Sequence, residues 1–261
     1  MLSTLLLIKI AVTLVAVLGL AWVAEHVSPR LAGILAGFPL GLAIILFFVT
    51  LEQGPEFGRE AAFAAIGGLS ANAVLALAYA AVARGTGWIA AIWAGAIATV
   101  AFLGVAAVMR GLMPGVLLSV AITCAVLALV WWALRQMADV RIARQARLGP
   151  LEVAIRAGMA AATVLLITGI AGLVGPVWSG LLAGFPVVAF PLLLILHARH
   201  GRAPVVTMVK SYPIGLTTLV IYALVVAAAF PVLGAGGGTL VGLAAAVPWL
   251  AGLSALRGRQ A

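Results

Sequence analysis

The chain has 261 residues, of which 66% are hydrophobic and only 8% charged, with a formal net charge of +9. A soluble domain of this length needs far more charge to cover its surface, so the composition excludes that class and indicates an integral membrane protein. The basic residues lie in short segments between apolar runs, which argues against a nucleic-acid-binding face.

Nine apolar runs are of the length that a helix needs to cross a bilayer, about 20 residues. They cover 5–24, 31–50, 61–83, 88–109, 112–134, 152–174, 177–197, 205–230 and 234–254. The first run resembles a secretory signal, but Lys9 lies inside it and not before it, so we expect this run to be retained. The sequence therefore predicts an all-α polytopic membrane protein with about nine transmembrane helices.

The basic residues between the runs predict how the chain is oriented. The longest connecting segment carries Arg135, Arg141, Arg144 and Arg147. Positive charge of this kind is typical of the cytoplasmic side. Counting runs from that segment places the N-terminus outside, the acidic segment 52–60 outside and the C-terminus inside. Arg110 is the exception, because it falls on the outer side.

The string LAGFP occurs twice, at 35–39 and at 182–186, which is a spacing of 147 residues (184 − 37). The same spacing pairs Pro29 with Pro176, Gly33 with Gly180, Gly54 with Gly201, Gly68 with Gly215, Lys9 with Arg156, and Arg110 with Arg257. An odd number of runs separates the copies, so they cross the membrane in opposite directions. We expect two inverted four-helix repeats, 1–110 and 151–261, joined over 111–150 by a linking helix and a basic loop.

The repeated motif falls near the middle of the second and seventh runs, where its proline interrupts helical hydrogen bonding. Pro39 and Pro186 have no N–H to donate, so the carbonyls of Leu35 and Leu182 should lose their helical partners. Freed backbone at this depth is tolerated only where protein or water surrounds it. Two interpretations stay open: broken helices that face a substrate path, or proline kinks packed against a neighbouring helix.

The motifs and five polar side chains are the candidate substrate-binding residues. They are Gly37, Phe38, Pro39, Gly184, Phe185, Pro186, Lys9, Arg156, Ser70, Asn72 and Thr217. Lys9 and Arg156 lie about one turn into their runs, where they either attract an anion at each mouth of a pathway or snorkel to headgroups. Ser70, Asn72 and Thr217 either line a cavity or bond between helices.

Other chemistry finds little support in the sequence. None of the six acidic residues falls deep in a run, which argues against coupling through a mid-membrane carboxylate. His26, His197 and His200 share one side but have no Asp or Cys beside them, so we expect no metal and no other cofactor. No nucleophile with its base, phosphate loop or dinucleotide fingerprint is present, so we expect no enzyme and no catalytic residue.

The stretch Ser179 to Pro186 (SGLLAGFP) resembles the Gly/Leu-rich Phe-Pro segment of small bacterial membrane proteins of the GlpM type. Those chains are about one repeat long. The resemblance therefore implies a fused, duplicated relative in a bacterial inner membrane, and it carries no functional residues over.

The expected function is a small secondary transporter or facilitator, with its pathway at the interface of the two repeats and an anionic or amphiphilic solute. Expected partners are membrane lipids and a small-molecule or lipid substrate, and a homo-oligomer stays open. Two alternatives also stay open. One is a lipid flippase or scramblase whose groove opens to lipid, and the other is a non-transporting assembly factor for envelope biogenesis.

Overall fold

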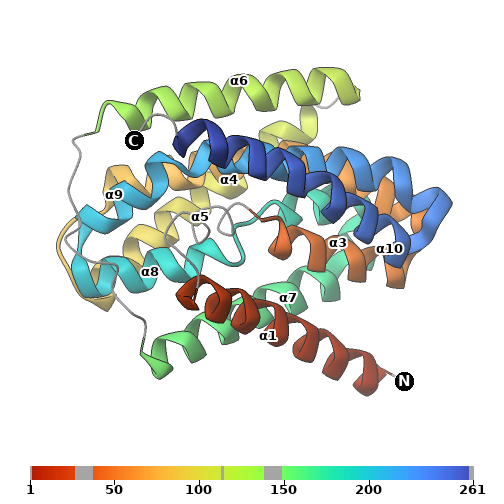
Figure 1. The fold of residues 1–261 in the computed structure, drawn as a ribbon, viewed down its shortest axis with the longest axis horizontal. Coiled ribbons are helices and arrows are strands. Elements are labelled where there is room, and N and C mark those ends of the chain that lie inside the picture. The colour runs from red at the N-terminus through yellow and green to blue at the C-terminus, as the bar shows by residue number, and fades with distance from the viewer. Residues whose placement is uncertain (1, 27–37, 113–114, 138–148, 259–261) are drawn as a thin grey trace.

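The structure is a computed structural model that describes residues 2–26, 38–112, 115–137 and 149–258 (Figure 1). Nearly all of these residues are helical, and no β-strand occurs among them. The helices are α1 (Leu2–His26), α3 (Leu40–Gln53), α4 (Pro55–Val82), α5 (Trp88–Gly111), α6 (Val116–Arg135), α7 (Pro150–Ala183), α8 (Ala189–His200), α9 (Arg202–Lys210) and α10 (Tyr212–Gly258).

Five helices of the described chain, α4, α5, α6, α7 and α10, are long and apolar enough to cross a bilayer. Large apolar side chains also cover the outside of the bundle, among them Leu117 on α6 and Ile89 on α5. A protein surrounded by water does not expose apolar surface on this scale. The all-helical membrane class predicted from the composition is therefore the class of the fold.

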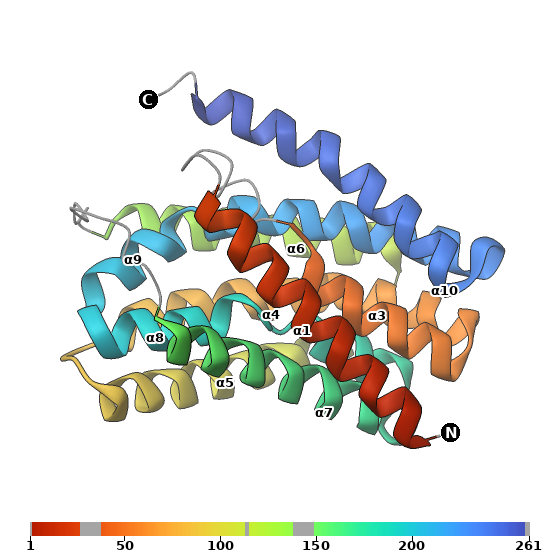
Figure 2. The ribbon, with the colours of Figure 1, turned by 60° about the horizontal axis from the view of Figure 1, so that its bottom comes forward.

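Helices α7 and α10 have 34 and 47 residues, and each reverses its direction at a glycine. Gly175 in α7 has φ +79° and Gly234 in α10 has φ +65°, a backbone conformation that residues with a Cβ rarely adopt. Figure 2 shows α10 running to one end of the molecule, turning there, and returning toward the C-terminus. The two glycines fall where the sequence separates its sixth run from its seventh, and its eighth from its ninth.

The connections gather at two opposite ends of the bundle (Figures 1 and 2). The N-terminus, the α3–α4 junction and the reversal in α10 lie at one end. The C-terminus, the α4–α5 connection and the α8–α9 junction lie at the other. At this second end the N–H of Gly87 donates to the carbonyl of Ala198 at 2.9 Å. The described chain thus alternates between two faces, as a membrane bundle does.

Helix α4 is the centre of the bundle and contacts α3, α5, α6, α7, α9 and α10. Its buried residues are largely alanine and glycine, which allow neighbouring helices to come close. Larger side chains such as Leu69, Leu75 and Tyr79 fill the space where the neighbours diverge, and all three are fully buried. The core therefore surrounds α4.

Helix boundaries recur at the 147-residue spacing of the repeated motif. The matched boundaries are Gln53 with His200, Pro55 with Arg202, Trp88 with Ala235, and Gly111 with Gly258. The glycines at these junctions match as well, because Gly54 and Gly201 have φ of +98° and +73°, and Gly87 and Gly234 have +96° and +65°. The two halves of the chain, 1–110 and 151–261, therefore have the same local structure at these points.

Candidate functional site

The seventh apolar run is broken at the second copy of the motif. Helix α7 ends at Ala183 and α8 begins at Ala189, which leaves residues 184–188 outside regular helix. Pro186 removes one amide donor there, and the N–H of Val187 closes a tight turn on the carbonyl of Phe185 at 2.8 Å. Of the two interpretations of this motif, a break describes the second copy and a simple kink does not.

The first copy makes the same turn in the part that the structure describes. The N–H of Leu40 donates to the carbonyl of Phe38 at 2.9 Å, and α3 begins directly after Pro39. The next bond also recurs: Ala43 N–H to Pro39 O is 2.8 Å, and Phe190 N–H to Pro186 O is 2.7 Å. Leu35 and Gly37 lie outside the described residues. The two motifs therefore share these two backbone hydrogen bonds, although α3 begins at Leu40 and α8 begins at Ala189, the counterpart of Leu42.

One expectation about the freed carbonyls is wrong. The carbonyl of Leu182 is not free, because the last turn of α7 tightens and the N–H of Phe185 donates to it at 2.9 Å. The unpaired backbone groups lie after the proline instead. The N–H groups of Val188 and Ala189 have no acceptor among the described residues. Free donors at the start of a helix favour an anion or a polar oxygen.

The residues that follow the two prolines are in contact with each other. A Cβ built on Gly41, in the first turn of α3, would lie 3.2 Å from the Cβ of Val187 and 3.6 Å from the Cγ2 of Val188. Gly41 and Val188 are counterparts at the 147-residue spacing (188 − 41). The amino-terminal ends of α3 and α8 therefore meet at this point.

Asn72 anchors the broken segment to α4. Its side chain is buried, and its Nδ2 donates to the carbonyl of Gly184 at 2.7 Å. The Tyr212 side chain, at the start of α10, lies close enough to interact with the same amide. The Oδ1 atom nevertheless makes no well-formed hydrogen bond within the described chain. Among the polar candidates, Asn72 is the one whose contact with the break is direct.

Helices α4 and α7 are in backbone contact beside the break. A Cβ built on Gly184 would overlap the backbone of Gly68, and one built on Gly180 would overlap the carbonyl of Ala61. Glycines four residues apart on one helix allow this kind of close crossing in membranes. The glycine of the second LAGFP motif is therefore needed for packing against α4 as well as for ending α7.

Phe185 supplies an apolar wall on the α5 side of the break. Its ring centroid lies 5.3 Å from that of Phe102 on α5 and 5.0 Å from that of Phe190 on α8, both edge to face. Such pairs fix the ring beyond the effect of burial alone. Phe38, its counterpart in the first half, is partly buried at the last position before Pro39.

Ser70 bonds to a neighbouring helix, and Thr217 bonds within α10. Ser70 Oγ donates to Thr123 Oγ1 on α6 at 3.0 Å. Thr217 Oγ1 donates to the carbonyl of Ile214 at 2.7 Å and accepts from Trp249 Nε1 at 3.0 Å. The bond of Ser70 joins α4 to α6, and the bond from Trp249 to Thr217 joins the two arms of α10.

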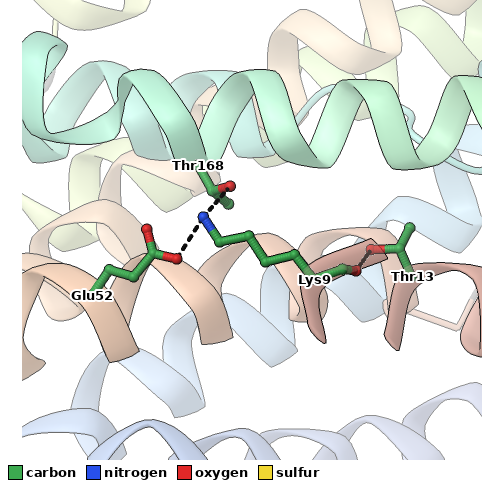
Figure 3. A network of polar contacts seen from close by, with 4 residues as sticks. All are labelled: Lys9, Thr13, Glu52 and Thr168. Carbon is green, nitrogen blue, oxygen red and sulfur yellow. Dashed lines mark hydrogen bonds and ion pairs between the residues drawn. The ribbon is translucent and has the colours of Figure 1, made fainter. Parts of the chain in front are cut away.

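Lys9, Glu52 and Thr168 form a buried polar network that joins three helices (Figure 3). Lys9 Nζ on α1 lies 2.5 Å from Glu52 Oε1 on α3 and donates to Thr168 Oγ1 on α7 at 2.9 Å. The ring of Phe48 lies 5.9 Å from the same nitrogen. The interpretation of Lys9 as a snorkelling cation or a free charge at a pathway mouth is therefore wrong: the charge is buried and paired.

Arg156, the counterpart of Lys9, is partly buried on α7, and its Nε has no partner among the described residues. Glu152, one turn earlier, is already engaged by Arg199 Nε at 2.5 Å and by the N–H of Gly149 at 2.6 Å. Arg199 is the counterpart of Glu52 (199 − 52 = 147). In each half, an ion pair thus joins the first helix to the end of the helix that follows the motif. The basic partner lies on the first helix in the pair Lys9–Glu52, and the acidic partner lies on the first helix in the pair Glu152–Arg199.

The described residues contain no group of three His, Cys, Asp or Glu side chains arranged to hold a metal ion. His197 is fully buried, and its Nδ1 lies 3.2 Å from the hydroxyl of Tyr79. This contact packs α8 against α4.

Comparisons of the chain with family models, with curated proteins and with solved structures find no match.

Proposed function

We propose that the protein is a small secondary transporter made of two inverted repeats, with nine crossings and a solute pathway where the repeats meet. The observation that carries this proposal is the contact of Gly41 with Val187 and Val188, which brings together the segments that follow Pro39 and Pro186. The break at residues 184–188 leaves backbone groups without helical partners, a cost of several kcal/mol in lipid unless protein or water surrounds them. Two breaks that face each other are the plan of many carriers.

The inverted arrangement is supported by the recurring backbone features. The matched helix boundaries and the glycines Gly54, Gly87, Gly201 and Gly234 keep one spacing across both halves. If α7 and α10 each contribute two crossings, with the turns at Gly175 and Gly234, the proposed nine crossings put an odd number of crossings between each residue and its counterpart. Counterparts then point in opposite directions, and the axis that relates them lies in the membrane plane.

The proposed orientation has the N-terminus and Glu56 outside and the C-terminus in the cytoplasm. The end of the bundle that carries the C-terminus also carries the α4–α5 connection and the α8–α9 junction, where Arg84, Arg199 and Arg202 are located. Lys and Arg accumulate on the cytoplasmic side. A bacterial inner membrane is proposed on the resemblance to the GlpM type.

The proposed solute is anionic or amphiphilic. The starts of α3 and α8 meet at the breaks, and a helix start carries partial positive charge. The N–H groups of Val188 and Ala189 have no acceptor among the described residues, and the Oδ1 atom of Asn72, whose Nδ2 binds the carbonyl of Gly184 in the same broken segment, has no hydrogen bond. These groups fit a carboxylate or phosphate with a nearby donor, and Phe185 fits an apolar part.

The first test identifies a ligand. Purified full-length protein is screened by thermal shift against carboxylates, phosphates and lipids, and compounds that raise the melting temperature are followed into proteoliposomes for uptake. Asn72→Leu should abolish the shift, whereas Ser70→Ala, two residues away on α4 but bonded to α6, should keep it. Lipid scrambling without uptake of any solute would contradict the transporter and favour a flippase.

The second test locks the two breaks together. In a Cys124→Ala background, Gly41→Cys and Val187→Cys place two Cβ atoms within reach of a disulfide. Oxidation should arrest uptake, reduction should restore it, and either single cysteine should be insensitive to both treatments. Full uptake by the cross-linked protein would show that the repeats do not move at this contact.

A further inference from the structure

The amino-terminal ends of α3 and α8 leave the same backbone donors without partners. In α8, the N–H groups of Val188 and Ala189 have no acceptor among the described residues. Their counterparts at the 147-residue spacing are Gly41 and Leu42, and neither N–H has an acceptor in the part of the chain that the structure describes. Donors at a helix end that is covered by protein need water, a side chain or a ligand to satisfy them.

The two helix starts touch each other. A Cβ built on Gly41 would lie 3.2 Å from the Cβ of Val187 and 3.6 Å from the Cγ2 of Val188. Leu42 and Val187 are both buried, so protein covers this contact. Each helix start carries about half a positive charge. Two starts that meet repel each other, and a bound anion relieves that repulsion.

Asn72 brings a buried acceptor to the same broken segment. Its side chain is 1% exposed, and its Nδ2 donates at 2.7 Å to the carbonyl of Gly184, where the break begins. Its Oδ1 atom makes no hydrogen bond within the described chain. A buried acceptor without a partner is costly, and an amide oxygen can only accept. A ligand that satisfies this atom therefore carries an N–H or an O–H.

The acceptor is present in one half only. The counterpart of Asn72 is Leu219 (219 − 72 = 147), whereas the N–H donors recur in both halves. The segments 38–47, 61–83 and 180–195 carry no Asp, Glu, Lys or Arg. On these segments the backbone dipoles alone attract an anion, and Asn72 alone fixes which way round the ligand lies.

We propose that these groups form one oxyanion site between the helix starts, and that its ligand carries its own hydrogen-bond donor. This inference rests on the proposed transport function, whose solute it narrows. The free N–H groups hold the negative oxygen atoms, and the Oδ1 atom of Asn72 accepts from the ligand. Hydroxycarboxylates, and phosphates that keep a proton at neutral pH, have this chemistry. Plain carboxylates and sulfate lack the donor.

The test compares anions that differ in the donor. Purified full-length protein is titrated with lactate against propionate, and with phosphate against sulfate at neutral pH, and the rise in melting temperature gives each Kd. In at least one pair the donor-bearing anion should bind about tenfold or more tightly, because its analogue leaves Asn72 unpaired. Equal binding within every pair that binds overturns the proposal.

A second arm separates a soluble ligand from a lipid headgroup. The protein is compared in nanodiscs of phosphatidylglycerol, whose headgroup carries hydroxyls, and of phosphatidylcholine, whose headgroup has no donor. Stabilisation by phosphatidylglycerol that Asn72→Leu removes, without a response to lactate or phosphate, keeps the site and contradicts a soluble solute. No response to any of the four anions or to phosphatidylglycerol overturns the proposal.

Ala189→Pro tests the backbone donors. Proline at the first position of a helix replaces an N–H that has no helical partner, so no helical hydrogen bond is lost. Affinity for the donor-bearing anion should fall about tenfold or more, as for a hydrogen bond to a charged group. Ile89→Pro in the first turn of α5 is the matched control, because its N–H also lacks a backbone acceptor among the described residues and its side chain is exposed. It should bind as the wild type does.

Asn72→Leu tests the acceptor from the other side of the ligand. It should bind lactate and phosphate only as weakly as the wild type binds propionate and sulfate. Ser70→Ala, on the same helix but bonded to α6, should keep the discrimination. The melting temperature without ligand checks that each variant is folded. Unchanged binding in both Asn72→Leu and Ala189→Pro overturns the proposal.

Binding and transport fail separately. If the discrimination depends on Asn72 and Ala189 but proteoliposomes take up neither lactate nor phosphate, the site stands and the transport function is refuted for these anions. If proteoliposomes take up propionate as readily as lactate, and sulfate as readily as phosphate, the transport function stands and this inference fails.

Discussion

Gly68 and Gly184 touch through their backbones where α4 crosses the end of α7, and a Cβ built on Gly184 would lie 2.7 Å from the Cα of Gly68. Side-chain carbons do not approach other atoms this closely. The contact positions the carbonyl of Gly184 for Asn72, one turn further along α4. Packing and polar anchoring of the break therefore depend on the same pair of helices.

Gly184→Ala should destabilise the protein by about 1–3 kcal/mol, the usual cost of forcing a methyl group into a filled space. Thermal unfolding of the purified protein measures the effect. Gly169→Ala on the same helix is the control, since nothing lies within 4 Å of a Cβ there, and alanine favours helix by up to about 1 kcal/mol. Equal melting temperatures for the two variants would show that the crossing tolerates a side chain.

Asn72→Leu should lower stability modestly, by about 1 kcal/mol, because hydrogen bonds inside membrane proteins are worth little more than that. The loss of uptake should be much larger, since Gly184 then has no anchor and the site loses a polar group. Uptake and unfolding are measured on the same preparation. A variant that transports normally would show that Asn72 contributes only to helix packing.

Pro39→Ala and Pro186→Ala should leave stability unchanged or raise it, because alanine restores a backbone donor and favours helix. Both variants should nevertheless transport poorly, since continuous helix would remove the break at residues 184–188 and the turn that Phe38 and Leu40 form around Pro39. Helix content and uptake together give the measurement. If uptake survives while helix content rises, the breaks have no part in the pathway.

Glu56→Cys should react with a membrane-impermeant thiol reagent in intact cells, and Thr86→Cys should react only after the cells are opened. Both side chains are exposed, and they belong to opposite ends of the bundle, Glu56 at the start of α4 and Thr86 in the α4–α5 connection. The background is Cys124→Ala. The reverse labelling pattern would invert the proposed orientation.

The sequence predicted the helical membrane class and the place of the second break, because hydropathy and proline act locally along the chain. It did not predict that Leu182 keeps a hydrogen bond, because a tightened last turn is one of several ways to end a helix. The contact between Gly41 and Val188 could be anticipated only from the repeat, which implies that counterparts approach each other near an axis.

The pairing of Lys9 with Glu52 was missed for a different reason. Glu52 follows an apolar run and belongs to the acidic segment that the sequence predicts to lie outside. The interpretation of Lys9 depends only on its depth in its own run. Neither position indicates the other, because their contact depends on how α1 packs against α3. One signal was present: the 147-residue spacing places Arg199 opposite Glu52, so this position is charged in both halves.

The exchange of charges between the ion pairs Lys9–Glu52 and Glu152–Arg199 means that the two halves are no longer interchangeable. A dimer of identical half-length chains would present the same ion pair to both sides of the bundle. A single chain lets each half diverge, so one end holds a pair in which both partners are largely buried and the other end holds a pair whose arginine is exposed. A protein whose two halves are joined in one chain can therefore respond differently to its two sides, which a symmetric pair of identical halves cannot do.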